Sequence, residues 1–427
     1  MRLDNAAKIY PAARRKNWSS VFRLSVSLTE DVDVKILQSA LDATLPRFPS
    51  LGARLRRGVF WYYLEQLDRA PLVGEDSSYP LTPMTKQDTR RCAFRILVYR
   101  ERIALELFHV LADGTGALIF LKTLLAEYLT QKHGLTIPAT HGVLDRQEQP
   151  REEEMEDSFQ KYAGAVAASR KGSPAWHATG TPELGGFLHQ TCFCLSVKEV
   201  LEKAHSYDVS LTVFLSAALM MALQNYQAER VPQQSRRKSI KLMIPVNLRR
   251  LFPSQTLRNF TMYSVPELIP RLGHYDFREI CSIVKHRMAL EVTDKHMSTM
   301  IAANIGAERL MAIRIIPLFL KNIVMKIVFN AVGERQTCLS LSNLGAVALP
   351  EQMQPYVTRF DFVLHPQATT PGNCSVISYG DTLCVNFIRN TREPDLEMHF
   401  HRALQALGLT AKVQSNRPKK EENQCTV

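Results

Sequence analysis

The stretch FHVLADGTGA, residues 108–117, decides how this chain of 427 residues is interpreted. The apolar segment IALELF leads into the stretch, and the apolar segment ALIFLKTLLAEYL follows it. The first segment predicts a strand, and the second predicts a helix. The stretch therefore lies on a strand-to-helix turn, a place where loops commonly carry functional side chains.

Three residues of this turn point to chemistry. The imidazole of His109 could take a proton from a hydroxyl, an amine or a thiol near neutral pH. Asp113 could bind backbone groups of the turn or pair with an arginine, and Gly114 permits backbone angles and close approaches that a larger residue resists. Histidine and aspartate four residues apart also occur by chance. The alternative interpretation is a histidine that only ends a strand, with an acidic residue at a helix N-terminus.

The bulk composition predicts a soluble globular protein with a basic surface. Hydrophobic residues make up 45% of the chain and charged residues 22%, and the length suits two domains. The net charge of +12 favours an anionic partner such as a phosphate-rich cofactor, an acidic carrier protein, nucleic acid or a membrane surface. No helix-turn-helix, zinc-finger or RNP-like pattern accompanies this charge, so we expect no nucleic-acid partner.

The cysteines and histidines predict neither a disulfide framework nor a metal site. The chain has 8 cysteines and no CxxC pair, and only Cys192 and Cys194 lie close together, as CFC. His399 and His401 form an HxH pair, but residues two apart on a helix point in different directions. The first residues lack the apolar core of a signal peptide. We therefore expect a reduced, cytoplasmic protein.

Helix-like and strand-like patterns alternate in both halves of the chain, which predicts an α/β (α+β) fold of two lobes, each with its own sheet. We expect an N-terminal lobe at 1–145, an acidic and Gly/Pro-rich surface connector at 146–186, a C-terminal lobe at 187–412 and a disordered tail at 413–427. Gly134 predicts the end of the helix that follows the His109 turn.

One apolar segment, LMAIRIIPLFLKNIVMKIVF at 310–329, raises the question of a membrane. Arg314, Pro317, Lys321 and Lys326 interrupt it, whereas a spanning helix needs about 20 apolar residues with few charges. The segment therefore predicts a buried or partly amphipathic helix. Contact with a membrane surface is the alternative.

The HxxxDG pattern after a strand, in a chain of this length, resembles the CoA-dependent acyltransferase superfamily. That superfamily includes chloramphenicol acetyltransferase, plant BAHD acyltransferases, alcohol acetyltransferases and the condensation domains of nonribosomal peptide synthetases. Three further segments are similar to its motifs in the same order: ALDATLPRFPSLGARL at 40–55, IPVNLRRLFPSQTLRNF at 244–260 and LSLSNLG at 339–345. The block at 315–345 and the LSLSNLG strand are most similar to the alcohol acetyltransferase branch.

Several residues depart from the patterns of the other branches. Phe108 stands where many condensation domains have a first histidine, and Gly52 stands where their early turn has an arginine. Arg258 replaces the glycine of the family's GNF segment, and the DFGWG signature of the plant enzymes is absent. These departures leave the alcohol acetyltransferase-like branch as the closest resemblance.

The resemblance implies a fold and a mechanism. Two chloramphenicol-acetyltransferase-like lobes would meet at a central tunnel, which an acyl thioester enters from one side and an acceptor from the other. His109 would act as general base on an alcohol or amine acceptor, without a covalent acyl-enzyme. Asp113 would be mainly structural and would pair with Arg249, the arginine of PVNLR, while Gly114 supports the turn. Acyl-CoA, with an acetyl or short acyl group, would be a co-substrate and not a permanently bound cofactor.

Further candidates have two interpretations each. Ser342 and Asn343 lie on a predicted strand and could stabilise an oxyanion, or they could be ordinary polar strand residues. Arg236, Arg237 and Lys238 could bind the phosphates of CoA, or they could be solvated surface charges. Two other functions also stay open: acyl transfer from an acyl carrier protein in secondary metabolism, and a non-catalytic role in binding a ligand.

Overall fold

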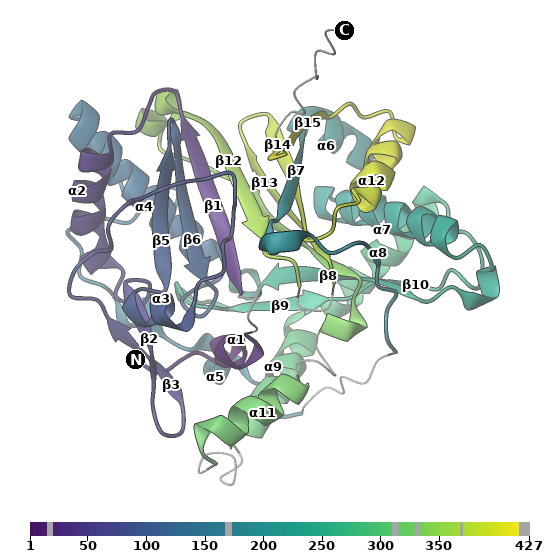
Figure 1. Ribbon diagram of the computed structural model, residues 1–427, viewed down its shortest axis with the longest axis horizontal. Helices are drawn as coiled ribbons and strands as arrows, with labels where there is room; N and C mark the ends of the chain where they lie inside the picture. The colour runs from purple at the N-terminus through teal and green to yellow at the C-terminus, as the bar shows by residue number, and fades with distance from the viewer. Residues whose placement is uncertain (15–19, 167–172, 310–315, 329–333, 368–369, 418–427) are drawn as a thin grey trace, which may run out of the picture.

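The computed structural model describes residues 1–14, 20–166, 173–309, 316–328, 334–367 and 370–417. Its described part forms two lobes, each built on a sheet with helices packed against it (Figure 1). The helices are α1 (Ile9–Ala13), α2 (Val34–Thr44), α3 (Lys86–Arg91), α4 (Gly114–His133), α5 (Ser158–Tyr162), α6 (Val197–Ser206), α7 (Leu211–Arg230), α8 (Phe277–Glu291), α9 (Asp294–Arg309), α11 (Leu318–Val328) and α12 (Asp395–Ala406).

The first lobe contains a sheet with the strand order β12-β1-β6-β5-β4 and a separate hairpin of β2 and β3. The strands are β1 (Val21–Leu28), β2 (Ala53–Arg57), β3 (Tyr62–Gln66), β4 (Gly74–Glu75), β5 (Phe94–Tyr99), β6 (Arg102–Phe108) and β12 (Val357–Leu364). Helices α2 and α4 lie along one face of this sheet (Figure 1). Helix α4 is buried on most sides, and it ends at Gly134 in the left-handed conformation, as predicted.

The second lobe contains a sheet with the order β10-β8-β11-β13-β14-β7-β15, and β9 pairs with β8. The strands are β7 (His189–Ser196), β8 (Ile240–Asn247), β9 (Thr261–Ser264), β10 (Glu267–Leu268), β11 (Leu339–Ala346), β13 (Gly372–Tyr379), β14 (Thr382–Arg389) and β15 (Lys412–Ser415). Alternate residues of β7 face different cores, so Phe193 and Leu195 pack toward helices α7 and α12 while Cys192 faces the first lobe.

A strand from the second half of the chain completes the first sheet. Strand β12 pairs antiparallel with β1, with Phe22 opposite Leu364 and Val26 opposite Phe360. Because β1 is buried along nearly its whole length, it needs a hydrogen-bonding partner on both edges, and β6 and β12 fill these places. Strand β12 also packs against β13 and β14, so the two lobes share this strand (Figure 1). The predicted lobe boundaries, at 145 and 187, assign β12 to the C-terminal lobe and so do not include its pairing with β1.

Two of the predicted boundary segments are more ordered than expected. Residues 413–415, which we assigned to a disordered tail, belong to β15 and pair with β7.

In the acidic connector, Glu154 is buried and accepts from the buried Arg47, with Nη2 at 2.8 Å from Oε1. The prediction of a surface connector was wrong at this residue, because a two-pronged bond from an arginine can hold an acidic side chain in the interior. Residues 418–427 lie outside the described residues.

Helix α11 covers part of the apolar segment that raised the membrane question. Its exposed side chains are largely apolar: Phe319, Leu320, Ile323, Val324 and Ile327 are each 43–62% exposed. Lys321 is its buried charge, with Nζ 3.6 Å from the centre of the Trp61 ring. The helix is therefore not buried as one of the two expectations had it, and its exposed side chains are mainly apolar. Among the described residues no single helix is long and apolar enough to span a membrane, and the bent pair α6 and α7 meets the test of length and composition only.

Candidate active site

The FHVLADGTGA turn joins β6 to α4 at the boundary between the lobes. Strand β6 ends at Phe108, and the backbone N–H of His109 donates to the carbonyl of Ser20 at 2.8 Å. Asp113 is the N-cap of α4, because its Oδ1 accepts from the backbone N–H of Gly116 at 3.1 Å. The backbone between them is rigidly held, since Val110, Leu111 and Ala112 are fully buried. The turn therefore fixes the direction of the His109 side chain.

Asn259, from the second lobe, determines which nitrogen of His109 carries the proton. The amide Nδ2 of Asn259 donates to the carbonyl of His109 and to Oδ2 of Asp4, each at 3.1 Å. Its Oδ1 then faces Nδ1 of His109 at 2.8 Å. Because this oxygen can only accept, Nδ1 carries the proton of the neutral ring and Nε2 keeps its lone pair. No described residue makes a hydrogen bond to Nε2.

Aromatic rings surround the imidazole. The ring of Tyr10, from α1, stacks on His109 with centroids 4.6 Å apart, and Phe22 from β1 meets it edge-on at 5.0 Å. Burial lowers the pKa of His109, and this effect outweighs the opposite influence of its own carbonyl, Asp113 and Asn259. The ring is therefore neutral at pH 7, the state that a general base requires. His109 nevertheless keeps part of its surface exposed.

Asp113 joins the first lobe to the second. Its Oδ2 accepts from Nη1 of Arg249 at 2.7 Å, from the backbone N–H of Phe260 at 2.9 Å and from the hydroxyl of Thr261 at 3.1 Å. Burial works against its charge, but Arg249 and the backbone N–H groups of Phe260 and Gly116 hold the pKa of this carboxyl below its ordinary value. Asp113 is thus a buried carboxylate with its hydrogen bonds filled by structural partners.

Arg249 extends this connection along the second lobe. Its Nε donates to the carbonyl of Thr256 at 2.9 Å and its Nη2 to the carbonyl of Arg258 at 2.6 Å. The guanidinium therefore holds the loop that carries Asn259 against Asp113. The structure brings together His109, Asp113 and Arg249, which lie far apart in the sequence.

Arg258, which replaces a glycine of the related motif, has a structural use in this chain. Its Nη2 donates to the carbonyl of Arg2 at 2.7 Å, and its Nη1 donates to the carbonyl of Met155 at 3.2 Å. Its Nε lies 3.6 Å from Oδ2 of Asp4. The arginine thus ties the N-terminal segment, which also supplies Tyr10, to the loop that carries Asn259.

Gly114 and Gly116 allow the second lobe to approach the turn. A Cβ on Gly114 would lie 2.6 Å from Cδ2 of Leu344, and a Cβ on Gly116 would lie 2.0 Å from the carbonyl oxygen of Leu257. Gly114 is the first residue of α4 and does not have a positive φ, so it serves close approach and not an unusual backbone angle. Gly116, which we had not singled out as a site residue, is the more confined of the two.

Gly116→Ala is expected to destabilise the protein more than Gly114→Ala. The methyl group at 116 would meet a backbone carbonyl, which cannot move without shifting the lobe boundary, whereas at 114 it would meet the end of a flexible leucine side chain. Overpacking of this kind costs about 1–3 kcal/mol, and we expect Gly116→Ala to reach that range. Urea unfolding of both variants measures the difference. Equal unfolding midpoints for the two variants would contradict this prediction, because they would show that the backbone at Leu257 can move to admit a methyl group without loss of stability.

Strand β11 reaches the turn and distinguishes Ser342 from Asn343. Leu344 lies beside Gly114. Leu341 packs in the core of the second lobe and Asn343 bonds to Thr212 of α7, so Ser342, between them on the strand, points to the opposite face of the sheet. Asn343 is engaged elsewhere, since its Nδ2 donates to Thr212 at 3.0 Å and its Oδ1 accepts from the N–H of Gly345 at 2.8 Å. Ser342 is therefore the better candidate for contact with a reacting group.

The basic residues Arg236, Arg237 and Lys238 lie away from the turn. They lie just before the first residue of β8. The last residue of β8, Asn247, lies beside the turn, because its Nδ2 donates to Oγ1 of Thr115 at 3.1 Å. A strand of this length spans about 23 Å at 3.3 Å per residue. Arg237 bends back onto its own loop and donates to the carbonyl of Val231 at 3.0 Å. The structure does not bring these three charges to His109.

Sequence reasoning missed Tyr10, Asp4 and the role of Asn259. Asn259 belongs to the RNF segment that carried part of the resemblance, so a signal for it existed. Tyr10 and Asp4 lie in a segment with no pattern that marks them, and only the packing of α1 brings Tyr10 to the imidazole.

Comparison with known proteins supports the fold. No protein-family model matches the chain, and no curated protein sequence matches it. Among solved structures, F. graminearum TRI101 complexed with coenzyme A and deoxynivalenol is similar to it at 10% identity, over 98% of this chain and 99% of that one, with a TM-score of 0.65. The TRI3 trichothecene 15-O-acetyltransferase from Fusarium sporotrichioides is 12% identical over 95% and 93% of the two chains, with a TM-score of 0.60.

A third similar structure is the condensation domain that mediates chain release from the enacyloxin polyketide synthase, 13% identical over 95% of this chain and 83% of that one, with a TM-score of 0.51. At these identities the likeness concerns the fold. The chain has the two-lobe α/β fold of these structures, and the fold that the motifs predicted is confirmed.

Proposed function

We propose that this protein transfers an acyl group, acetyl or another short acyl, from a CoA thioester to an alcohol or amine, with His109 as general base. The observation that carries the proposal is the hydrogen bond between Nδ1 of His109 and Oδ1 of Asn259. This bond leaves Nε2 of a neutral imidazole unprotonated at the boundary of the lobes, which is the state that a base needs. The acyltransferase fold and the neighbours complexed with coenzyme A support the choice of thioester.

The proposed reaction has two steps. Nε2 of His109 takes the proton of the acceptor hydroxyl or amine while the acceptor oxygen or nitrogen forms a bond to the thioester carbonyl carbon. The tetrahedral intermediate then collapses, the carbon–sulfur bond breaks, and the departing thiolate takes the proton back from Nε2. The products are an ester or amide and free CoA. Asp113 and Arg249 do not exchange protons in this proposal. The carboxylate accepts from Arg249, from the Thr261 hydroxyl and from backbone N–H groups, and the guanidinium donates to Asp113, to Asn247 and to backbone carbonyls.

Ser342→Ala is expected to lower kcat about 10²-fold with little effect on stability. We propose that its hydroxyl donates to the oxyanion of the intermediate, because Ser342 points away from α7 on the strand whose Leu344 lies beside Gly114. A preorganised donor of this type is worth about 10²–10³ in rate. Steady-state kinetics with saturating thioester measure the effect, and Asn343→Ala is the neighbouring control. A loss of activity in the Asn343 variant only would reverse the assignment.

Tyr10→Ala is expected to move the acidic limb of the kcat/KM profile to higher pH. Burial lowers the pKa of His109, so removal of the stacked ring should admit water and raise that pKa toward its ordinary value of 6.5. Because the neutral ring is the active form, activity is then lost at a higher pH on acidification. Tyr10→Phe retains the ring and should keep the limb in place. Superimposable profiles for all three proteins would contradict this prediction.

The direct test of the proposed function is an assay of thiol release with identified products. The protein is incubated with acetyl-CoA or short acyl-CoA and a mixed panel of alcohols and amines, and the products are identified by mass spectrometry. Acceptor-dependent release of CoA with a matching ester or amide supports the proposal. A second arm replaces CoA with acyl carrier proteins, since one neighbour is a condensation domain. Transfer from carrier proteins only, or no transfer at all, would overturn the choice of donor or of function.

A further inference from the structure

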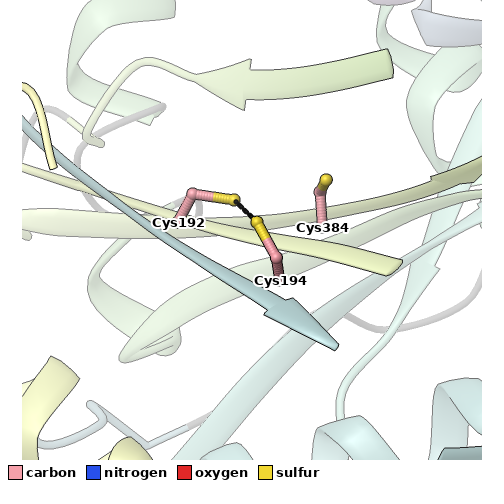
Figure 2. Close-up of side chains that lie close together, drawn as sticks. All are labelled: Cys192, Cys194 and Cys384. Carbon is pink, nitrogen blue, oxygen red and sulfur yellow. Dashed lines mark hydrogen bonds between the residues drawn. The ribbon is translucent and has the colours of Figure 1, made fainter. Parts of the chain in front are cut away.

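Three cysteine side chains meet on one face of the second sheet, away from the His109 turn. Cys192 and Cys194 come from β7 and Cys384 from β14 (Figure 2). Their three Sγ atoms all lie within 4.8 Å of one another, and the Sγ atoms of Cys192 and Cys194 are 3.7 Å apart. Cys192 and Cys384 are buried, whereas Cys194 is half-buried and gives the cluster contact with solvent.

Strand geometry explains why these three residues meet. Cys192 and Cys194 are two apart on a strand, so their side chains point to the same face of the sheet. Cys384 is directly opposite Cys194 in the antiparallel pairing of β14 with β7. Neither the spacing of two residues on β7 nor the cross-strand pairing produces a CxxC motif. The sequence alone therefore indicated no metal site. The cross-strand partner lies nearly 200 residues further along the chain.

The distances suit a metal ion bound by three thiolates. With zinc–sulfur bonds of about 2.3 Å, two ligands of a tetrahedral site lie about 3.8 Å apart, and two ligands of a trigonal site about 4.0 Å apart. The observed separation of 3.7 Å between Cys192 and Cys194 matches this range, and Cys384 lies within 4.8 Å. A small rotation of the cysteine side chains would bring all three Sγ atoms to these separations.

Nearby groups from the first sheet add charge and a further oxygen. Nη2 of Arg359, on β12, donates to Sγ of Cys192 at 3.0 Å and offsets part of the negative charge of a thiolate. Oδ1 of Asp361 lies 3.9 Å from the same sulfur and accepts from Arg359 at 2.6 Å and from Asn386 at 3.3 Å.

We propose that Cys192, Cys194 and Cys384 bind a thiophilic d10 cation such as Zn²⁺, with the fourth position left to water or to Asp361. Sulfur ligands select soft and borderline cations over Mg²⁺ and Ca²⁺, which prefer oxygen. On binding, up to three S–H bonds lose their protons to solvent and three metal–sulfur bonds form, with no change in oxidation state. The ion would cross-link β7 and β14 beneath the shared strand β12.

The test uses the reduced, full-length protein with Zn²⁺ and Cd²⁺ as probes. Native mass spectrometry should find one Zn²⁺ per chain after removal of excess metal, and Cd²⁺ titration should produce the ultraviolet band of cadmium–thiolate charge transfer with an endpoint of one equivalent. Loss of a second-shell group already costs about 10–100-fold in metal affinity, so Cys194→Ser and Cys384→Ser should each lower it about 100-fold or more.

Cys92→Ser is the matched control, because Cys92 is half-buried like Cys194 but lies outside the cluster. It should bind one equivalent with the affinity of the parent. Thermal unfolding of the metal-free variants shows whether they fold, and Cys194→Ser is the safer variant since its side chain reaches solvent. Zinc binding that is equal in the Cys194→Ser and parent proteins would overturn the proposal. So would a parent protein that takes up no metal and instead forms a disulfide within the cluster under air.

Discussion

His109→Ala is expected to lower acceptor-dependent thiol release about 10²–10⁴-fold, the range that a positioned general base contributes. The effect should fall on kcat, because removal of the imidazole leaves both substrates bound but leaves the acceptor proton without a base. Asn259 holds the ring in the tautomer that this role needs, with its Oδ1 at 2.8 Å from Nδ1. The measurement is steady-state kinetics with the acyl-CoA and acceptor that the product panel identifies.

Two further variants make this result specific. His205, an exposed histidine on α6, is the matched control, and His205→Ala should keep the parental rate. Asn259→Ala should retain the ring of His109 but lose the bond that fixes its tautomer, so an intermediate loss of kcat is expected. If His109→Ala released thiol at the parental rate in the presence of acceptor, the general-base assignment would be wrong.

Asp113→Asn is expected to destabilise the protein by about 3–5 kcal/mol, the cost of removing one partner from a buried ion pair. The carboxylate is 5% exposed and its partner Arg249 is 12% exposed, so water cannot take the place of the carboxylate beside the guanidinium charge. The same oxygen also accepts from the backbone N–H of Phe260, which holds the second lobe to the turn. Urea unfolding monitored by circular dichroism gives the free energy.

The control for this prediction is an ion pair on the surface. Asp208 and Lys285 are 2.6 Å apart but Asp208 is fully solvated, so Asp208→Asn should leave the unfolding midpoint unchanged. A double replacement of Asp113 and Arg249 by Asn and Met should cost less than the sum of the two single changes, because the pair acts as a unit. Unchanged stability together with lost activity in Asp113→Asn would favour a chemical role for Asp113.

Lowering the pH should remove part of the stability that the Asp113 carboxylate contributes. The folded state depresses the pKa of Asp113, so its contribution is complete above the ordinary value of 3.8 and is lost as the pH falls toward the lower value of the folded protein. Asp113→Asn lacks this titrating group. The difference in stability between parent and variant should therefore shrink as the pH is lowered below 3.8.

The local structure around His109 was predictable because it depends on neighbours in sequence. An apolar strand, a turn with two glycines and a long apolar helix are readable from periodicity, and the resulting β6, turn and α4 are present. The resemblance added the order of the motifs and the pairing of Asp113 with Arg249, which the structure contains at 2.7 Å. The roles of His109 and Ser342 remain predictions that the variants above test.

Other parts depend on contacts that no local pattern records. The completion of the first sheet by β12, the stacking of Tyr10 on His109 and the approach of Cys384 to Cys194 each join segments far apart in the sequence. Burial also differed from expectation at two places. Glu154, in the predicted surface connector, is buried, and α11, for which burial was one of the expectations, exposes its apolar residues.

By itself, the sequence determined the strand and helix on either side of the HxxxDG turn, the place of that turn and the class of chemistry that a histidine there can perform. The tertiary structure alone decided which nitrogen of His109 holds the proton, how closely Leu257 approaches Gly116 and which thiols meet. The physical reason is that periodicity and capping act within a few residues along the chain. Tautomers, close approaches and ligand clusters are set by atoms that folding brings together from distant segments.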